Sequence, residues 1–422
     1  MKILRLSALL TLVAPGLGAQ EPGNSGFAAE CSLEQPGHWD GDGPVLVRGS
    51  VRGPQGTAEG RFLFDTGTGR TVLDQDFARR IGIEIGLNVS IAGLGGADSA
   101  AVAAVPGIDF GGYSFTEVGV ALLDLSFLSF DPLPIDGILG SDLLRECIVE
   151  LDLPAAKVRF APAEWESFAE GYAFGELRWF AGTPQVQVQV DGLPAWFTLD
   201  TGNTASTSLH GPFFREHYDA AGAPHMRIHG AAGSALVWAG RLGTLVIGGH
   251  EWRGVQAFAP ASLSSGGLLN SPAADGNLGM DILRHHDVLF DYARNRIGFR
   301  AADARAERPK GDLGLRVAPR GDGYQVVAVI ERSAAAKARI RVGEHLLAVA
   351  GEAVAGLDRS ELMNLMSGEP GSEVEVTVQA SNKPPRKAKL TRKDVFPLFR
   401  LRAPAKTEDA GVAEPDDGGK GE

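Results

Sequence analysis

The sequence predicts a mainly β protein in which two homologous β lobes form a pseudo-dimer and a small α+β domain follows. Three observations support this fold class. Residues 44–165 contain short alternating apolar runs separated by glycines, which is typical of antiparallel strands. Residues 166–300 repeat that pattern in the same order. Residues 311–395 follow a charged segment and combine strand-like with helical runs, so we expect a separate unit.

The composition indicates a soluble globular protein. The chain has 422 residues, of which 44% are hydrophobic and 22% charged, and its formal net charge is −12. This length supports two or three domains. Because the sequence offers no basic stripe for phosphates, nucleic acid and anionic membrane surfaces are not expected as partners.

The N-terminus has the pattern of a secretory signal peptide, which we assign to residues 1–19. Lys2 and Arg5 precede an apolar run at residues 6–14, and small residues follow up to Ala19. The run is too short to span a bilayer, and no other stretch of the sequence reaches that length. An apolar N-terminus that merely frays is the alternative. The pattern predicts a secreted or periplasmic protein without a membrane span.

Residues 20–43 form an N-terminal segment that carries Cys31, one of the two cysteines in the chain. In an oxidising compartment Cys31 could pair with Cys147 and tie this segment to the first lobe. Two separate thiols are the alternative, and the sequence does not decide between them. A catalytic cysteine is not expected, because no suitable His partner is in view.

Each lobe contains one copy of a two-part motif. The first part is an apolar strand that ends in Asp-Thr-Gly, at residues 62–68 and 197–203. The second part is an apolar element followed by glycine, within residues 136–144 and 275–283. A single Asp-Thr-Gly usually marks a turn. Two ordered motifs at nearly the same offset indicate a duplicated domain with two facing carboxylates.

Two facing carboxyl groups can activate a water molecule for hydrolysis of a peptide bond. When they are too close to ionise together, one keeps a proton and acts as acid while the other acts as base. Their titration then belongs to the pair, which in this chain would be Asp65 and Asp200. The neighbouring threonines offer hydroxyls for hydrogen bonds, and the glycines permit close approach of the loops. These supporting residues are Thr66, Gly67, Thr201 and Gly202.

Between the two parts of the motif, each lobe has a stretch that reads as a hairpin with a Gly-rich tip. The stretches are residues 89–97 and 226–234. Glycine supplies the positive φ angles that such tips need. The tip residues are Gly93, Leu94, Gly95, Gly96, Gly230, Ala231, Ala232 and Gly233.

On these motifs, residues 44–300 resemble a single-chain, bilobal aspartic peptidase of the pepsin and retropepsin superfamily. The resemblance implies that Asp65 and Asp200 are the catalytic pair. It also implies that both hairpins are substrate-binding flaps, as in a retroviral dimer fused into one chain. Two features depart from the superfamily pattern: the second apolar element opens with Asn277, and Tyr113 lies beyond the first hairpin, so a pepsin-like flap tyrosine is missing.

Residues 311–395 resemble a PDZ domain, which a linker at residues 301–310 joins to the second lobe. Leu313, Gly314 and Leu315 stand at the position of its carboxylate-binding loop. Such a domain binds an extended peptide by strand addition, with backbone amides holding a terminal carboxylate. The resemblance therefore implies a C-terminal peptide as partner. A domain that only packs against the peptidase or another protein is the alternative.

The remaining polar residues are not expected to act in catalysis. Asp142 and Asp281, each in Gly-x-Asp-x-Leu, are interpreted as helix-capping residues. The histidines lack ligand spacing, so neither a metal nor another cofactor is expected. Residues 396–422 are assigned to a disordered acidic tail, because residues 406–422 are rich in Glu, Asp and Gly.

The sequence thus favours an aspartic endopeptidase with a C-terminal PDZ domain, acting on a polypeptide substrate. Because both aspartates lie in one chain, a monomer suffices to build the site. The alternative is a non-enzymatic peptide-binding or scaffold protein, which has little reason to keep two mutually repelling acids. Processing of its own chain is a third possibility, and it requires the same dyad.

Overall fold

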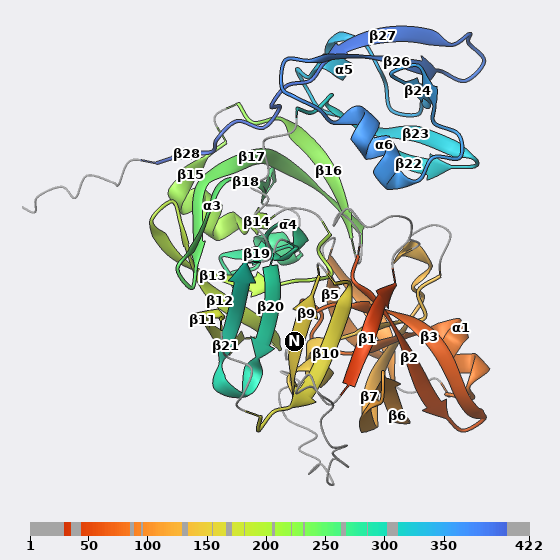
Figure 1. The fold of residues 1–422 in the computed structure, drawn as a ribbon, viewed down its shortest axis with the longest axis vertical. Coiled ribbons are helices and arrows are strands. Elements are labelled where there is room, and N and C mark those ends of the chain that lie inside the picture. Colours follow the sequence, from red (N-terminus) through yellow and green to blue (C-terminus); the bar gives the residue numbers. More distant parts are fainter. Residues whose placement is uncertain are drawn as a thin grey trace, which may run out of the picture.

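The computed structural model describes residues 29–34, 44–84, 88–93, 96–128, 134–153, 155–165, 171–180, 182–204, 207–220, 222–230, 233–262, 267–284, 286–301 and 311–402. These residues form two β lobes and a smaller domain beside the second lobe (Figure 1). The predicted mainly β fold is confirmed. The predicted signal peptide, most of the linker and the end of the tail lie outside the described residues.

The two lobes consist of short strands with brief helices between them. The first contains β2 (Leu46–Gly53), β3 (Gly56–Phe64), β4 (Val72–Asp74), α1 (Gln75–Arg80), β5 (Asn88–Gly93), β6 (Gly96–Phe110), β7 (Tyr113–Leu123), η1 (Ser126–Leu128), β8 (Gly137–Leu139), α2 (Ser141–Leu144), β9 (Cys147–Asp152) and β10 (Lys157–Pro162). The second contains β11 (Ala173–Phe180), β12 (Thr183–Val190), β13 (Leu193–Leu199), β14 (Thr207–Leu209), α3 (Gly211–His217), β15 (Tyr218–Asp219), β16 (His225–Gly230), β17 (Gly233–Ile247), β18 (His250–Pro260), η2 (Leu268–Asn270), β19 (Gly276–Leu278), α4 (Met280–Leu283), β20 (His286–Asp291), η3 (Tyr292–Arg294) and β21 (Arg296–Ala301).

The lobes share one topology. In the first lobe, β3 pairs in parallel with β8, while β4 runs antiparallel to β8 and parallel to β7. In the second lobe, β13, β19, β14 and β18 repeat these pairings in the same senses. The hairpins β5–β6 and β16–β17 also correspond. The repeated pairing pattern is what a duplicated domain would produce.

A sheet shared by both lobes joins them. Its strand order is β1-β10-β9-β20-β21-β11, where β1 covers Ala29–Glu34. At its centre, β9 of the first lobe pairs antiparallel with β20 of the second, with Val149 opposite Phe290. The second lobe thus contributes three strands, the first lobe two and the N-terminal segment one, and the loops that carry the two aspartates face each other at this joint.

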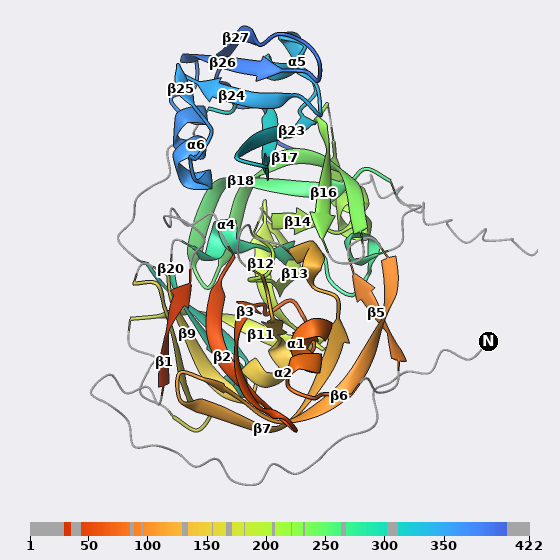
Figure 2. The same ribbon diagram turned by 90° about the vertical axis from the view of Figure 1, so that its right-hand side faces the viewer.

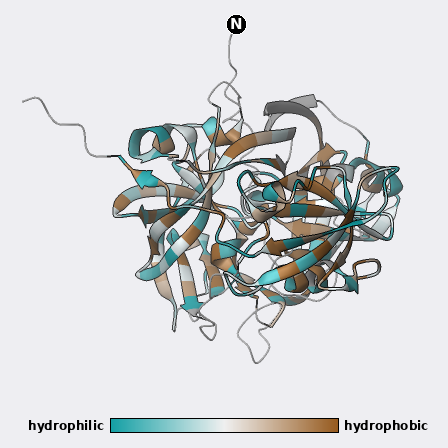
Figure 3. Ribbon diagram, turned by 90° about the horizontal axis from the view of Figure 1, so that it is seen from above, coloured by the Kyte–Doolittle hydropathy of each residue, from teal (hydrophilic) through white to brown (hydrophobic). Residues whose placement is uncertain are grey.

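Alternation of side chains buries one face of each strand, as the sequence predicts. In β12, Val186, Val188 and Val190 are buried, while Gln187 and Gln189 are exposed. Gln185 departs from this pattern, since its side chain is buried and donates to the carbonyl of Ala273 at 2.8 Å. Hydrophobic and hydrophilic residues alternate in this way along many strands (Figure 3).

The C-terminal domain has its own hydrophobic core. It contains β22 (Leu315–Arg320), β23 (Gly323–Val329), α5 (Ala334–Lys337), β24 (His345–Val349), β25 (Glu352–Ala353), α6 (Arg359–Met366), β26 (Glu373–Gln379) and β27 (Arg386–Thr391). Its sheet order is β22-β23-β24-β26-β27. Strand β27, which follows β26, was not expected from the sequence. Within the described residues, β22 pairs only with β23 and is an edge strand.

The predicted boundary of the disordered tail at residue 396 is wrong. Residues 394–402, here called the C-terminal strap, return from the small domain to the second lobe, where β28 lies beside β15 (Figure 1). Figure 2 shows the small domain next to β16, β17 and β18 of that lobe. Phe396 and Phe399 are 4% and 5% exposed, and β28 (Arg400–Leu401) pairs antiparallel with β15. Burial of these two aromatic rings offsets the ordering entropy that the polar composition of the remaining tail cannot.

The expected helix caps are also corrected. Gly140 and Gly279 occupy the N-cap positions of α2 and α4, so Asp142 and Asp281 lie inside the first turns. The carboxylate of Asp142 instead accepts hydrogen bonds from the amide and the hydroxyl of Thr71, both at 2.8 Å. Asp281 forms an ion pair with Arg284. No helix among the described residues is long and apolar enough to cross a bilayer.

Candidate active site

Asp65 and Asp200 stand where β3 and β13 end. The amide of Asp65 donates to the carbonyl of Leu139 at 3.0 Å, and the amide of Asp200 donates to the carbonyl of Leu278 at 3.1 Å. Each aspartate is therefore held by the apolar strand, β8 or β19, that lies parallel to its own. This contact explains why the two parts of the motif occur together in each lobe.

Thr66 and Thr201 lock the two loops together through reciprocal hydrogen bonds. Each hydroxyl accepts from the amide of the other threonine, at 3.0 and 3.1 Å. Each hydroxyl also donates across the interface, Thr66 to the carbonyl of Leu199 at 2.9 Å and Thr201 to that of Phe64 at 2.7 Å. Both threonines are fully buried. These four bonds fix the relative position of the aspartates.

The two carboxyl groups lie close together across the lobe interface, each against the glycine of the opposite loop. Asp65 is 9% exposed, and its Oδ1 accepts from the amides of Gly67 at 2.9 Å and Thr68 at 3.1 Å. Its Oδ2 accepts from the hydroxyl of Thr68 at 2.6 Å. Gly67 thus lies at the site, as expected, while the contribution of Thr68 was missed although it directly follows the Asp-Thr-Gly.

Asp200 has a different set of donors. Its Oδ1 accepts from the amide of Asn203 at 2.9 Å, and its Oδ2 accepts from Nδ2 of Asn277 at 2.5 Å. The side chain of Asn203 donates to Oδ1 of Asn277 at 2.9 Å. Asn277 was noted in the sequence only as a departure from the apolar pattern. Its contact with Asp200 depends on the pairing of β13 with β19, which the sequence does not display.

The pKa of each aspartate is raised above its ordinary value. Desolvation is the main cause for both groups. The pKa of Asp200 is raised to about 7, with the negative charge of Asp65 as the second cause. Because the groups are in contact, the values describe the pair, which holds one proton between its acid and alkaline titration steps.

The predicted flap hairpins exist as strand pairs. Gly93 pairs with Gly96 at the end of β5–β6, and Gly230 pairs with Gly233 at the end of β16–β17. The remaining tip residues, Leu94, Gly95, Ala231 and Ala232, lie outside the described residues. Their assignment to substrate binding stays a prediction.

The predicted carboxylate-binding loop is partly occupied by the chain itself. Leu313 and Leu315 are buried, and Gly314 has a φ of +79°. The amide of Gly314 donates to Oδ1 of Asp312 at 2.5 Å, and Asp312 forms an ion pair with Arg316. By the resemblance, the amide of Gly314 would bind the carboxylate of a peptide. It already donates to the carboxylate of Asp312.

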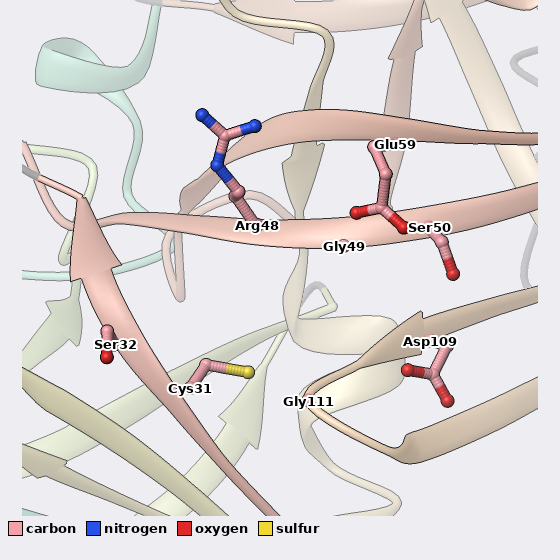
Figure 4. Close-up of a pocket in the computed structure, with 8 residues that line it drawn as sticks. All are labelled: Cys31, Ser32, Arg48, Gly49, Ser50, Glu59, Asp109 and Gly111. Atoms are coloured by element: carbon pink, nitrogen blue, oxygen red, sulfur yellow. The ribbon is translucent and has the colours of Figure 1, made fainter.

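A separate pocket of about 430 Å³ lies on the first lobe, away from the dyad (Figure 4). It is lined by Cys31, Ser32, Arg48, Gly49, Ser50, Glu59, Asp109 and Gly111. Cys31 and Cys147 are both buried and free, so they form no disulfide with each other. Burial raises the pKa of the Cys31 thiol to about 12, so this thiol stays protonated and is a poor nucleophile.

The fold and this site define a bilobal protein in which duplicated loops bring two aspartates, Asp65 and Asp200, close together. Residues 47–143 and 186–282 match the family model described as aspartyl protease, and residues 311–389 match that of the PDZ domain. The two lobes thus belong to the aspartyl protease family, and a PDZ domain follows them. The resemblance stated from the motifs is confirmed.

Comparisons with individual proteins add little. No curated protein matches the chain. A solved structure titled photosystem II D1 C-terminal processing protease is 30% identical over 22% of this chain, with a TM-score of 0.20. The match covers 26% of that protein, about a quarter of its length. A likeness of this size does not indicate a common fold.

Proposed function

We propose that the protein is an aspartic endopeptidase that hydrolyses peptide bonds with a water molecule held between Asp65 and Asp200. The observation that carries this proposal is the close approach of the two carboxyl groups across the lobe interface, each against the glycine of the opposite loop, with pKa values raised by burial. Burying two carboxyl groups side by side costs folding stability, which favours a catalytic role for their shared proton. The family match of both lobes supports the same class of reaction.

In the singly protonated dyad, the ionised carboxyl removes a proton from the water as its oxygen attacks the carbonyl carbon of the peptide bond. The protonated carboxyl gives its proton to the carbonyl oxygen. When the tetrahedral diol collapses, the C–N bond breaks and the leaving nitrogen takes the proton held by one carboxyl, while the diol hydroxyl that becomes the new carbonyl gives its proton to the other carboxyl. The pair is then again singly protonated, so each cycle consumes only water and the peptide bond.

The test is digestion of a mixed peptide library, from acid to neutral pH, by the wild type and by Asp65→Asn and Asp200→Asn. Each substitution keeps the size of the side chain but removes the titrating group. Asp124→Asn serves as the matched control, because Asp124 is exposed. We expect cleavage by the wild type and the control alone. Identical product patterns for all four proteins would contradict the proposal and leave the peptide-binding scaffold as the function.

We propose in addition that the PDZ domain binds an extended peptide along the free edge of β22. Support comes from the edge position of this strand and from the family match. A labelled peptide in free-acid and amidated forms measures the role of the terminal carboxylate. Equal absence of binding by both forms would contradict peptide capture at this edge.

A secreted or periplasmic location is also a proposal, supported by the pattern of residues 1–19. Expression of the full chain and N-terminal sequencing of the mature protein test it. We expect the mature chain to begin near residue 20, and an intact Met1 in all fractions would contradict export by this signal.

A further inference from the structure

The outer carboxylate oxygen of each aspartate is held by a different chemical group. In the first lobe the hydroxyl of Thr68 contacts Oδ2 of Asp65 at 2.6 Å. In the second lobe Asn203 stands in place of Thr68, and Nδ2 of Asn277 contacts Oδ2 of Asp200 at 2.5 Å. The duplicated lobes are therefore asymmetric at the one point where their chemistry meets.

Strand register identifies the counterpart of Asn277 in the first lobe. Asn277 pairs with Thr198 in β13–β19, and Ile138 pairs with Leu63 in β3–β8. Ile138 is buried in an apolar cluster. An isoleucine side chain thus fits this strand position in the first lobe. The second lobe has a polar amide at the same position.

The orientation of the Asn277 amide follows from its second partner. Nδ2 of Asn203 donates to Oδ1 of Asn277 at 2.9 Å, which leaves Nδ2 of Asn277 directed at Asp200. An amide nitrogen can only donate, whereas a hydroxyl such as that of Thr68 can donate or accept. The Asn277 amide therefore stabilises the ionised form of Asp200, in which Oδ2 is the stronger acceptor.

We propose that Asn277, oriented by Asn203, is a positioning residue that stabilises the ionised form of Asp200 through Oδ2 and thereby sets the pH range in which the dyad is singly protonated. This inference rests on the proposed function of the same site. It assigns the departure from the apolar motif a role in that function.

The direction of the effect is fixed by the charge of the acceptor. A hydrogen bond to a carboxylate favours its ionised form and lowers its pKa. Loss of the Asn277 amide therefore raises whichever titration step of the pair involves Asp200. The active range moves to higher pH in either case, by on the order of one pH unit for one charge-assisted bond.

The experiment compares Asn277→Val with the wild type and with Ile138→Val, which makes a similar change at the matching strand position without touching a dyad oxygen. The readouts are the pH profile of kcat/KM and the carboxyl midpoints from ¹³C NMR titration of Asp-labelled protein. We expect both readouts to shift upward in Asn277→Val, and a smaller shift of the same sign in Asn203→Ala. Midpoints in Ile138→Val report the effect of repacking alone.

Unchanged midpoints in folded Asn277→Val would overturn the proposal, as would an equal shift in Ile138→Val. If Asn277→Val does not fold, Asn203→Ala decides, and unchanged midpoints there overturn it. The NMR titration needs no substrate. Failure of the proposed peptidase activity, seen as no cleavage by the wild type, is thereby distinguished from failure of this inference.

Discussion

Gly67 and Asp200 lie so close across the lobe interface that a Cβ atom added to Gly67 would stand 2.4 Å from Cγ of Asp200. Gly202 bears the same relation to Asp65, also at 2.4 Å. Each loop therefore places its own acid and leaves room for the acid of the other. The closeness of the two carboxyl groups depends on the absence of two side chains.

Gly67→Ala should separate the carboxyl groups and lower kcat/KM by about 10²-fold, the scale of a misplacement near 1 Å. Gly202→Ala should do the same. Gly323→Ala is the control, because a Cβ there meets nothing within 4 Å. Steady-state kinetics with one cleaved peptide measures the effect. Near wild-type rates for Gly67→Ala would show that the dyad does not need this close approach.

Thr66→Val should destabilise the protein by about 2–4 kcal/mol, because it leaves the buried amide of Thr201 and the carbonyl of Leu199 without partners. Thr66→Ser keeps the hydroxyl and should lose less. Urea unfolding followed by tryptophan fluorescence gives both values. If valine and serine variants were equally stable, the reciprocal bonds would contribute nothing to the joint between the lobes.

Stability should fall as pH rises towards neutrality. The pKa of Asp200 is about 7 in the folded chain, whereas an unfolded Asp titrates near about 3.9. The folded state thus holds this proton more tightly, and the stabilisation is complete below the unfolded pKa and is lost as pH rises through about 7. Comparison of unfolding free energies with Asp200→Asn isolates this part, since the variant does not titrate there. Parallel pH curves for the two proteins would contradict it.

Activity should decline in the same upper range. Above the higher titration step of the pair, both carboxyl groups are ionised, and no proton is left for the carbonyl oxygen of the substrate. The alkaline limb of the kcat/KM profile should therefore have its midpoint at about pH 7. A profile that stays flat well beyond this pH would show that the dyad does not act as the proton donor.

Phe399→Ala should release the C-terminal strap. The ring of Phe399 is 5% exposed and lies 5.0 Å from that of Phe214, and its amide donates to the carbonyl of Arg241 at 2.9 Å. Loss of a buried phenylalanine costs about 3–5 kcal/mol. Leu401→Ala, at a side chain 44% exposed, is the control. Limited proteolysis near residue 400 should be faster in Phe399→Ala alone, and equal rates would contradict a packed strap.

Local pattern predicted much of the fold. The hairpins expected at residues 89–97 and 226–234 correspond to β5–β6 and β16–β17, since alternating apolar residues and tip glycines are local signals. The repeated motif also identified Asp65 and Asp200 as a pair, because duplication shows in the sequence itself. The structure brings their carboxyl groups into contact.

Non-local contacts escaped the sequence. The shared sheet depends on pairing between β9 and β20, and the sequence of neither strand indicates the other as its partner. The strap was missed because the tail was assigned from the polar composition of residues 406–422, whereas residues 395–401 contain five large apolar side chains. Asn277 was visible as an exception, but its meaning required the neighbouring strand that places it against Asp200.

The strap changes what the PDZ domain can do mechanically. A domain attached by a single flexible linker takes many positions relative to the rest of the molecule. A peptide bound to such a domain reaches a second site by diffusion of the domain. This domain follows β21 of the second lobe and returns to that lobe through β28, while Ile330 and Phe396 pack in one cluster with Val237 of the β16–β17 hairpin. The two attachments restrict how far the edge of β22 can move from the dyad. If both act on one polypeptide, as proposed, that polypeptide must be long enough to reach from β22 to the dyad, so the attachments would set a minimum substrate length.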